Sequence, residues 1–490
     1  MSDLKIKSLK STIWSFIENF GTQGIHFIFG VILARLLSPK DYGIIGVLSI
    51  FMGLANIIVD SGFKLSIIRS RNISHEDCST IFYTNLILSL VVSCILFSSS
   101  SLVADYFRIE VLKSILKVYA IIPILNGFGI VQMALMHKSL AFDKIAKISI
   151  SSNIISGVIA IIMALLGYSY WALVYKSVAS ALFINIFLWL YSDWRPKFEF
   201  SYLSLKKHFN FSIKILMTDL VDVIFDNIYS PIFGKKFSIK ELGFFSKGRS
   251  FADLISHTLS ASVQKVSTPL LASIPENNDI ISPFKKLLKA VTMLIFPILT
   301  LFIIIAPTLF STLLGEKWLP IVPYFRILAF AGFIYPILNS CSCLFQVEGR
   351  SDLIFIYALV NRILQILILL ITLKYNTIII TVGILFHSLF CLILMLFNIK
   401  VFLKIKVIPV LRVLKYPILL SIIIAISAKL VNLIFLTLIY DIIVIIIQFI
   451  LSLLVSYIFL KLSGSEELSL INEIFINRLF KSNKVKMENI

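Results

Sequence analysis

Residues 35–43 read Arg-Leu-Leu-Ser-Pro-Lys-Asp-Tyr-Gly, and residues 235–243 read Lys-Lys-Phe-Ser-Ile-Lys-Glu-Leu-Gly. Serine, lysine and glycine recur at the same places 200 positions apart, and the basic and acidic positions keep their charge. Each copy holds the Ser-x-x-acid pattern of a capping box, in which the serine accepts from the first free N–H groups of a helix. We therefore expect one helix to begin after Ser38 and another after Ser238, as corresponding parts of an internal repeat.

Long apolar stretches lie on both sides of each copy and recur along nearly the whole chain. Of the 490 residues 58% are hydrophobic, whereas soluble domains are about 45–50% apolar. A bilayer core about 30 Å thick needs about 20 mostly apolar residues per helix. The sequence predicts an all-α polytopic membrane protein.

Fourteen membrane-spanning helices are expected from these stretches. They cover approximately residues 12–35, 43–63, 80–103, 114–136, 148–166, 170–191, 210–233, 243–272, 289–313, 323–345, 353–373, 377–399, 416–438 and 441–461. The eighth is too polar for hydropathy to select, and it is included because the repeat and an even number of spans require it.

The basic residues predict the orientation in the membrane. The net charge is +19, from 45 Lys and Arg against 26 Asp and Glu. With the N-terminus in the cytoplasm, cytoplasmic segments hold about 27 of the basic residues and external loops about 9, which is the positive-inside bias. Both termini are therefore predicted to be cytoplasmic, and topology rather than nucleic-acid binding explains the charge. All loops are short, which leaves no room for an inserted soluble domain.

The repeat divides the spans into two blocks of six. We expect residues 1–209 to form the first bundle with a cytoplasmic linker, 210–405 the second bundle, 406–462 two additional helices and 463–490 a polar cytoplasmic tail. Since six is even, both blocks enter the membrane in the same orientation. Transporters built from parallel repeats bind their substrate between the halves.

Polar residues at helical spacing mark spans one, seven and eight. A charge at the centre of a span costs about 2.5–3.5 kcal/mol on insertion scales, so it faces a cavity or a partner. Spacings of three and four place each set on one helix face. The set that we assign to ion coupling or to the cavity wall comprises Asp219, Asp222, Asp226, Asp253, His257, Glu18 and His26.

Basic residues within the spans are candidates for binding an anionic substrate, because cationic side chains pair with a pyrophosphate through charge-assisted hydrogen bonds. They are Arg249, Lys247, Lys265, Lys176 and Arg362. Any one charge within the spans fits an interhelical salt bridge equally well, but the coincidence of the polar sets on spans one, seven and eight favours a water-filled cavity. Nothing indicates a catalytic set, a metal site or another cofactor, and the five cysteines are expected to be buried thiols.

Three stretches carry a family resemblance. LARLLSPKDYGIIG (33–46) resembles the hallmark of polysaccharide flippases in the multidrug/oligosaccharidyl-lipid/polysaccharide exporter superfamily. LLGEKWLPIVPYFRIL (313–328) with Glu-Gly-Arg-Ser at 348–351, and GKKFSIKELGFFSKG (234–248) after Asp226, are similar to two further signatures. The Ile-Gly pair that commonly follows the aspartate is replaced here by a segment containing Pro231, where we expect a kink.

The resemblance covers about residues 1–460 and implies two six-helix bundles around a cleft lined by spans one, two, seven and eight. It implies a flippase of the bacterial inner membrane that carries undecaprenyl-pyrophosphate-linked oligosaccharide repeat units, such as those of O-antigen lipopolysaccharide, to the periplasmic face. The implied mechanism is alternating access without ATP, driven by an ion or by the membrane potential. The expected partners are the lipid-linked oligosaccharide, membrane lipids, H⁺ or Na⁺ and a polysaccharide polymerase.

Three alternatives remain open. A multidrug-type cation antiporter of the same superfamily would favour an acidic, aromatic cavity, whereas these spans mix both signs. A peptidoglycan-precursor flippase would use the same mechanism. A membrane polysaccharide polymerase would need a long external loop, and none is predicted.

Overall fold

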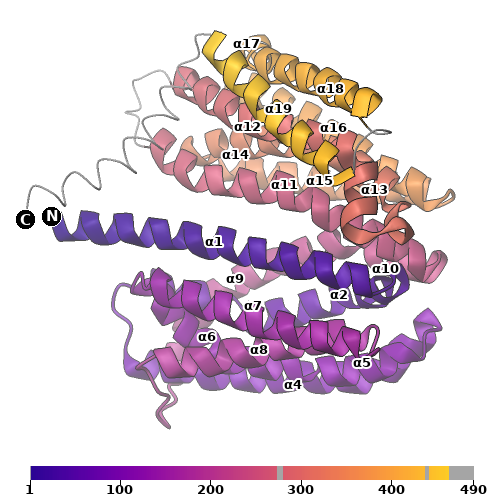
Figure 1. Cartoon of the computed structure of the whole chain (residues 1–490). Helices are drawn as coiled ribbons and strands as arrows, with labels where there is room; N and C mark the ends of the chain where they lie inside the picture. Colours follow the sequence, from indigo (N-terminus) through magenta and orange to yellow (C-terminus); the bar gives the residue numbers. More distant parts are fainter. Residues whose placement is uncertain (1, 273–279, 436–440, 463–490) are drawn as a thin grey trace, which may run out of the picture. The chain divides into compact units, whose positions relative to one another are not determined.

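The structure is a computed structural model that describes residues 2–272, 280–435 and 441–462. Within these ranges every regular element is a helix (Figure 1). The predicted all-α fold class is therefore confirmed. The predicted tail 463–490 lies outside the described residues.

The helices of the first half and their bounds are α1 (Ser2–Leu36), α2 (Pro39–Asp60), α3 (Phe63–Arg69), α4 (His75–Phe107), α5 (Val111–Tyr119), α6 (Ile121–Lys138), α7 (Phe142–Leu165), α8 (Trp171–Tyr191), α9 (Tyr202–Asn227), α10 (Tyr229–Lys236) and α11 (Ile239–Ala272). Those of the second half are α12 (Ile281–Leu314), the short 3₁₀-helix η1 (Glu316–Trp318), α13 (Ile321–Gly332), α14 (Tyr335–Val347), α15 (Ser351–Thr372), α16 (Thr377–Phe402), α17 (Val407–Arg412), α18 (Lys415–Phe435) and α19 (Asp441–Leu462).

Each predicted span coincides with one helix or with two consecutive helices. In the described part of the chain, 11 segments are long and apolar enough to cross a membrane. The other three predicted spans are α1, α9–α10 and α11, which carry the polar residues assigned to the cavity. The seventh span breaks at Ile228, and Pro231 stands in the first turn of α10, where a missing N–H costs no helical hydrogen bond.

The chain forms two compact units, Met1–Ser246 and Lys247–Ile490. In the first unit α4, α6, α7 and α8 pack on one another, and α1 lies along α7 (Figure 1). The helices α9 and α10, which open the second repeat block, pack against α2 in this unit.

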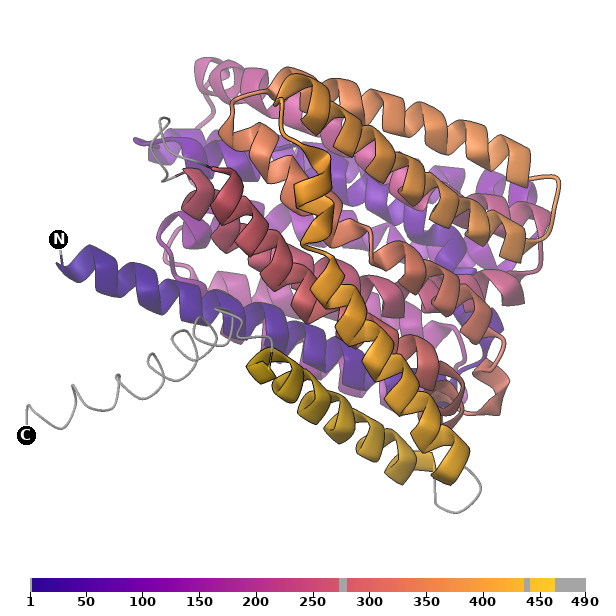
Figure 2. The same cartoon turned by 90° about the horizontal axis from the view of Figure 1, so that it is seen from above.

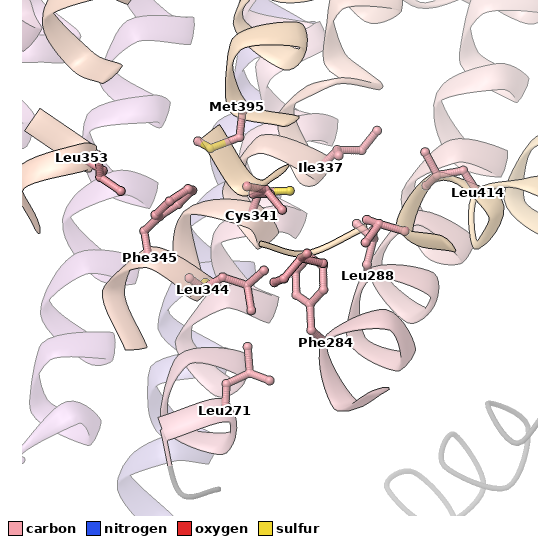
Figure 3. Packing of buried hydrophobic residues seen from close by; sticks show 14 of the residues in the cluster. Leu271, Phe284, Leu288, Ile337, Cys341, Leu344, Phe345, Leu353, Met395 and Leu414 are labelled. Carbon is pink, nitrogen blue, oxygen red and sulfur yellow. The ribbon is translucent and has the colours of Figure 1, made fainter. Parts of the chain in front are cut away.

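A buried apolar cluster holds the second unit together. Leu271 of α11, Phe284 and Leu288 of α12, and Cys341 and Leu344 of α14 are all fully buried in it (Figure 3). Lipid tails are as apolar as these side chains, so close van der Waals packing rather than removal from water fixes these helices to one another. The additional helices α18 and α19 pack on each other and on α12 (Figure 2).

One expectation about the cysteines is wrong. Four of the five are buried, but Cys94 is exposed on α4. Its neighbours Val91 and Ile95 are exposed on the same helix. An apolar run was taken to indicate burial inside the protein, whereas this face of a membrane helix is suited to lipid.

Both copies of the repeated motif start a helix as predicted. Ser38 Oγ accepts from the Asp41 N–H at 3.3 Å, and the Asp41 carboxylate accepts from the Ser38 N–H at 2.8 Å, which completes a capping box. In the second copy Ser238 Oγ accepts from the Glu241 N–H at 3.1 Å.

The two motif copies also touch each other within the first unit. A Cβ atom on Gly43 would lie 1.8 Å from the carbonyl oxygen of Ile239, and one on Gly243 would lie 1.9 Å from the carbonyl oxygen of Pro39. Positions 39 and 239, like 43 and 243, correspond in the repeat. The contact is therefore reciprocal, as across a two-fold axis. The backbones of α2 and α11 approach this closely because neither glycine has a side chain.

We predict that Gly43→Ala and Gly243→Ala each lower the unfolding temperature in detergent, because the new methyl group overlaps a backbone oxygen. Overpacking typically costs about 1–3 kcal/mol. Both substitutions separate the same two helices, α2 and α11. The double variant should therefore lose less stability than the sum of the losses in the two single variants. The unfolding temperature is measured with a thiol-reactive fluorogenic dye, which labels the buried cysteines as the protein unfolds. Gly24→Ala is the control, because no heavy atom lies within 4 Å of its added Cβ. An unchanged unfolding temperature for Gly43→Ala would contradict the contact.

Candidate functional site

The predicted acidic residues of the seventh span lie on one uninterrupted helix. Asp219, Asp222 and Asp226 are spaced by three and four residues on α9, so they occupy one face. Asp219 is half-buried, and the other two are exposed. Asp219 lies close enough to Asp222 for their charges to interact. Like charges at this spacing repel, so the face favours uptake of a proton or a cation.

A fourth carboxylate that the sequence analysis missed joins this face from α2. The two helices are in close contact, since a Cβ on Gly53 would lie 2.9 Å from Val223 Cγ1 and one on Gly62 would lie 2.8 Å from the Ser212 carbonyl oxygen. Asp60 stands in the last turn of α2 and interacts electrostatically with Asp219 and with Lys64.

The sequence analysis did not single out Asp60, which lies close to the predicted end of the second span. The resemblance, which places the second and seventh spans together in a cleft, was the signal that could have found it. Periodicity alone could not, because the contact joins residues 159 positions apart.

A second polar group in the first unit involves α1 and α8. His26 is exposed on α1, and half-buried Lys176 on α8 acts on it electrostatically. Glu18, two turns earlier on α1, is half-buried. The structure thus brings together a predicted substrate cation and a predicted cavity histidine that are distant in sequence.

In the second unit the three residues at four-residue steps on α11 form a ladder. Arg249 Nε lies 3.3 Å from Asp253 Oδ2, and His257 Nε2 lies 3.5 Å from Asp253 Oδ1. The ring of His257 stacks on Tyr335 of α14, with centroids 3.7 Å apart. This tyrosine was not predicted, because nothing in the sequence pairs α11 with α14.

The ladder remains accessible although its members contact one another. The side chains of Arg249, Asp253 and His257 are 32%, 43% and 50% exposed. Arg249 engages one carboxylate oxygen through Nε, and the guanidinium carries further N–H donors. Lys247 lies one turn before Phe251, with its ammonium 5.3 Å from the ring centroid. The ladder therefore offers donors suited to an anion.

The two remaining cationic candidates are less informative. Arg362 Nη1 donates to Gln365 Oε1 of its own helix α15 at 3.3 Å. The side chain of Lys265 lies outside the described part of the structure, although its backbone belongs to α11. Among the described residues, no group of three or more His, Cys, Asp or Glu side chains could hold a metal ion.

The fold is shared with a known lipid transporter. The structure of the lipid II flippase MurJ in an inward closed conformation matches with a TM-score of 0.73 and 13% identity, covering 93% of this chain and 100% of that chain. This likeness shows that the two proteins share a fold.

Curated relatives point to polysaccharide biosynthesis. The lipopolysaccharide biosynthesis protein WzxC of Escherichia coli is 24% identical over 363 residues, which are 72% of each chain. The teichuronic acid biosynthesis protein TuaB of Bacillus subtilis is 25% identical over 307 residues, 61% of this chain and 63% of TuaB. The family model described as polysaccharide biosynthesis protein matches residues 32–323, which is more than half of the chain. This multi-pass membrane protein belongs to the polysaccharide biosynthesis protein family.

Proposed function

We propose that this protein is a flippase that moves an oligosaccharide linked to undecaprenyl pyrophosphate from the cytoplasmic to the outer face of the bacterial inner membrane. The observation that carries the proposal is the solvent-accessible ladder of Arg249, Asp253 and His257 on α11. Its helix is too polar to count among the 11 apolar segments, yet it lies in a chain with the fold of a lipid flippase. Charged groups on such a helix require a cavity or a partner.

Arg249 is the residue to which we assign the pyrophosphate. A guanidinium presents a planar fork of donors that matches phosphate oxygens, whereas a lysine offers a point charge. Asp253 accepts from Arg249 Nε and so orients the guanidinium. Lys247, Lys176 and Arg362 are assigned supporting roles along the path, as is Lys265.

The acidic face of α9 is assigned to energy coupling by H⁺ or Na⁺. Asp219, Asp222 and Asp226 would bind the ion together with Asp60 in one state of the alternating-access cycle and release it in the other. The charge bias of the loops supports cytoplasmic termini, with the lipid-linked substrate loaded from the inner leaflet. A polysaccharide polymerase on the outer side would consume the product.

The overall function is tested in a strain that lacks the gene. Lipid-linked oligosaccharide should accumulate on the cytoplasmic face, and export of the polymer should stop until the gene is restored. Accumulation of lipid-linked peptidoglycan precursor instead, or increased sensitivity to cationic drugs with normal polymer export, would replace this function with one of the two alternatives from the same superfamily.

We predict that Arg249→Glu abolishes polymer export and that Arg249→Ala reduces it about tenfold to hundredfold, because hydrogen bonds to charged groups contribute about 1.5–3 kcal/mol. The matched control is Arg350→Ala, since Arg350, which directly precedes α15, forms an equally local pair with Asp352 in the first turn of that helix at 2.9 Å. The charge swap Arg249→Asp with Asp253→Arg should not restore export. Full restoration by the swap would show that the pair is only a structural salt bridge.

We also predict that replacing Asp219, Asp222 and Asp226 together by Asn abolishes ion-driven transport while the protein still reaches the membrane. If Asp60 and Asp219 serve the same ion, Asp60→Asn combined with Asp219→Asn should be no worse than the more severe single change. Transport is followed in proteoliposomes with an imposed pH or Na⁺ gradient, and Asp193→Asn, on an exposed acid between α8 and α9, is the control. If the triple variant transports as fast as the wild-type protein, these three acids take no part in the mechanism.

A further inference from the structure

The segment between α8 and α9, residues 192–203, is fixed to the protein although it begins without regular structure; we call it the linker segment. Arg195 Nη2 donates to the Trp189 carbonyl oxygen at 2.7 Å, and its Nη1 donates to the carbonyl oxygens of Ser192 and Trp194. A cation at these carbonyls satisfies the C-terminal end of α8 and complements its dipole.

The backbone of the linker segment is also hydrogen-bonded to the start of α4. The Lys197 N–H donates to Ser79 Oγ at 3.2 Å, and the Ser201 N–H donates to Thr80 Oγ1 at 3.0 Å. One turn into α9, the hydroxyl of Ser204 donates to the Asp77 carboxylate at 2.5 Å. The segment is thus held against α4 at both ends.

The side chains between these bonds form a largely exposed apolar face, in which the ring of Phe198 stacks on Tyr83 of α4 with centroids 5.9 Å apart. Apolar and polar residues alternate from Lys197 to Tyr202, which in an extended chain puts every second side chain on one side. The exposed fractions of Phe198, Phe200 and Tyr202 are 100%, 57% and 70%, and that of Leu203 is 79%. A segment hydrogen-bonded to α4 therefore presents four large apolar side chains.

The surroundings of this apolar face are basic and adjoin a membrane helix. Exposed Arg195, Lys197, Lys206 and Lys207 outnumber exposed Asp193 and Glu199. The last turn of α8, a candidate span, exposes Leu190 and Tyr191, so its apolar surface continues into the linker segment. The loop charges place this end of α8 on the cytoplasmic side.

We infer that the linker segment is an interfacial anchor, which inserts Phe198, Phe200, Tyr202 and Leu203 into the cytoplasmic leaflet while its basic residues contact anionic phospholipid headgroups. Aromatic side chains favour this boundary, and juxtamembrane lysines and arginines are attracted to anionic lipids. The bilayer is favoured over a soluble partner protein because the exposed face is continuous with the apolar surface of α8. The anchor holds the cytoplasmic end of α9 at a constant depth.

Spin labels measure this depth in the full-length protein. Single cysteines at positions 198 and 200, in a variant whose five native cysteines are replaced, are labelled in lipid nanodiscs. Glu199→Cys is the matched control, because Glu199 faces His75 at 3.8 Å rather than lying on the apolar face. We expect labels at 198 and 200 to be severalfold more accessible to oxygen, relative to a water-soluble nickel chelate, than the label at 199.

Nanodiscs of different lipid composition test whether the basic residues contact anionic headgroups. The spin label at position 198 should lie deeper in nanodiscs that contain phosphatidylglycerol than in nanodiscs of pure phosphatidylcholine. The double substitution Lys206→Gln with Lys207→Gln should remove this difference in depth, and high salt should do the same. Equal access of the nickel chelate to labels at 198, 200 and 199 would overturn the anchor. Shielding of 198 and 200 from both reagents would also overturn it, in favour of a protein contact.

A second measurement avoids the cysteine replacements in case that variant does not fold. Phe198→Trp in the otherwise native protein should lose more fluorescence to brominated phospholipids than the native protein does. The native protein supplies the baseline from its five tryptophans. No added quenching from position 198 would contradict insertion.

Discussion

Two backbones touch at Gly43 and Gly243, and the placement of the charged helices in the first unit depends on this contact. A methyl group on either glycine would overlap a carbonyl oxygen of the other motif copy. The crossing sets where α2 and α11 begin relative to each other. Farther along, α2 packs on α9 and brings Asp60 to Asp219, while α11 continues into the second unit with the ladder of Arg249. One glycine pair therefore joins the start of α2, which carries Asp60, to the start of α11, which carries Arg249.

The charges on these helices follow from the cost of burying ions in lipid. A lone charge within a span is expensive, and the structure reduces the cost in two ways. On α11 Asp253 pairs with Arg249 and contacts the imidazole of His257 at four-residue steps, so its carboxylate does not stand alone. On α9 like charges share a face with Asp60, an arrangement that an arriving cation or proton stabilises. The first arrangement suits an anionic headgroup, and the second suits a coupling ion.

Local features of the fold could be predicted from the sequence, whereas contacts between distant segments could not. Apolar length located thirteen of the predicted spans on helices and the repeat located the eighth, while the Ser-x-x-acid pattern located the starts of α2 and α11. The repeat indicated that Gly43 and Gly243 correspond but not that they touch. In the candidate site, the three- and four-residue spacing predicted which polar residues share one face of α9 and one face of α11. Asp60 and Tyr335 were missed because each joins the site through packing of separate helices. The linker segment was predicted only as a connection, because its bonds to α4 depend on the same kind of packing.

The central claim is that this chain alone carries a lipid-linked oligosaccharide across a bilayer. The most direct measurement reconstitutes the purified protein in liposomes that contain undecaprenyl-pyrophosphate oligosaccharide, and uses an external glycosidase to count the sugar on the outer face over time. We expect the protected inner pool to become cleavable with the protein and to stay protected in liposomes with the Arg249→Glu variant or without protein. A protected pool that the wild-type protein leaves unchanged, in vesicles with an imposed ion gradient, would contradict the account.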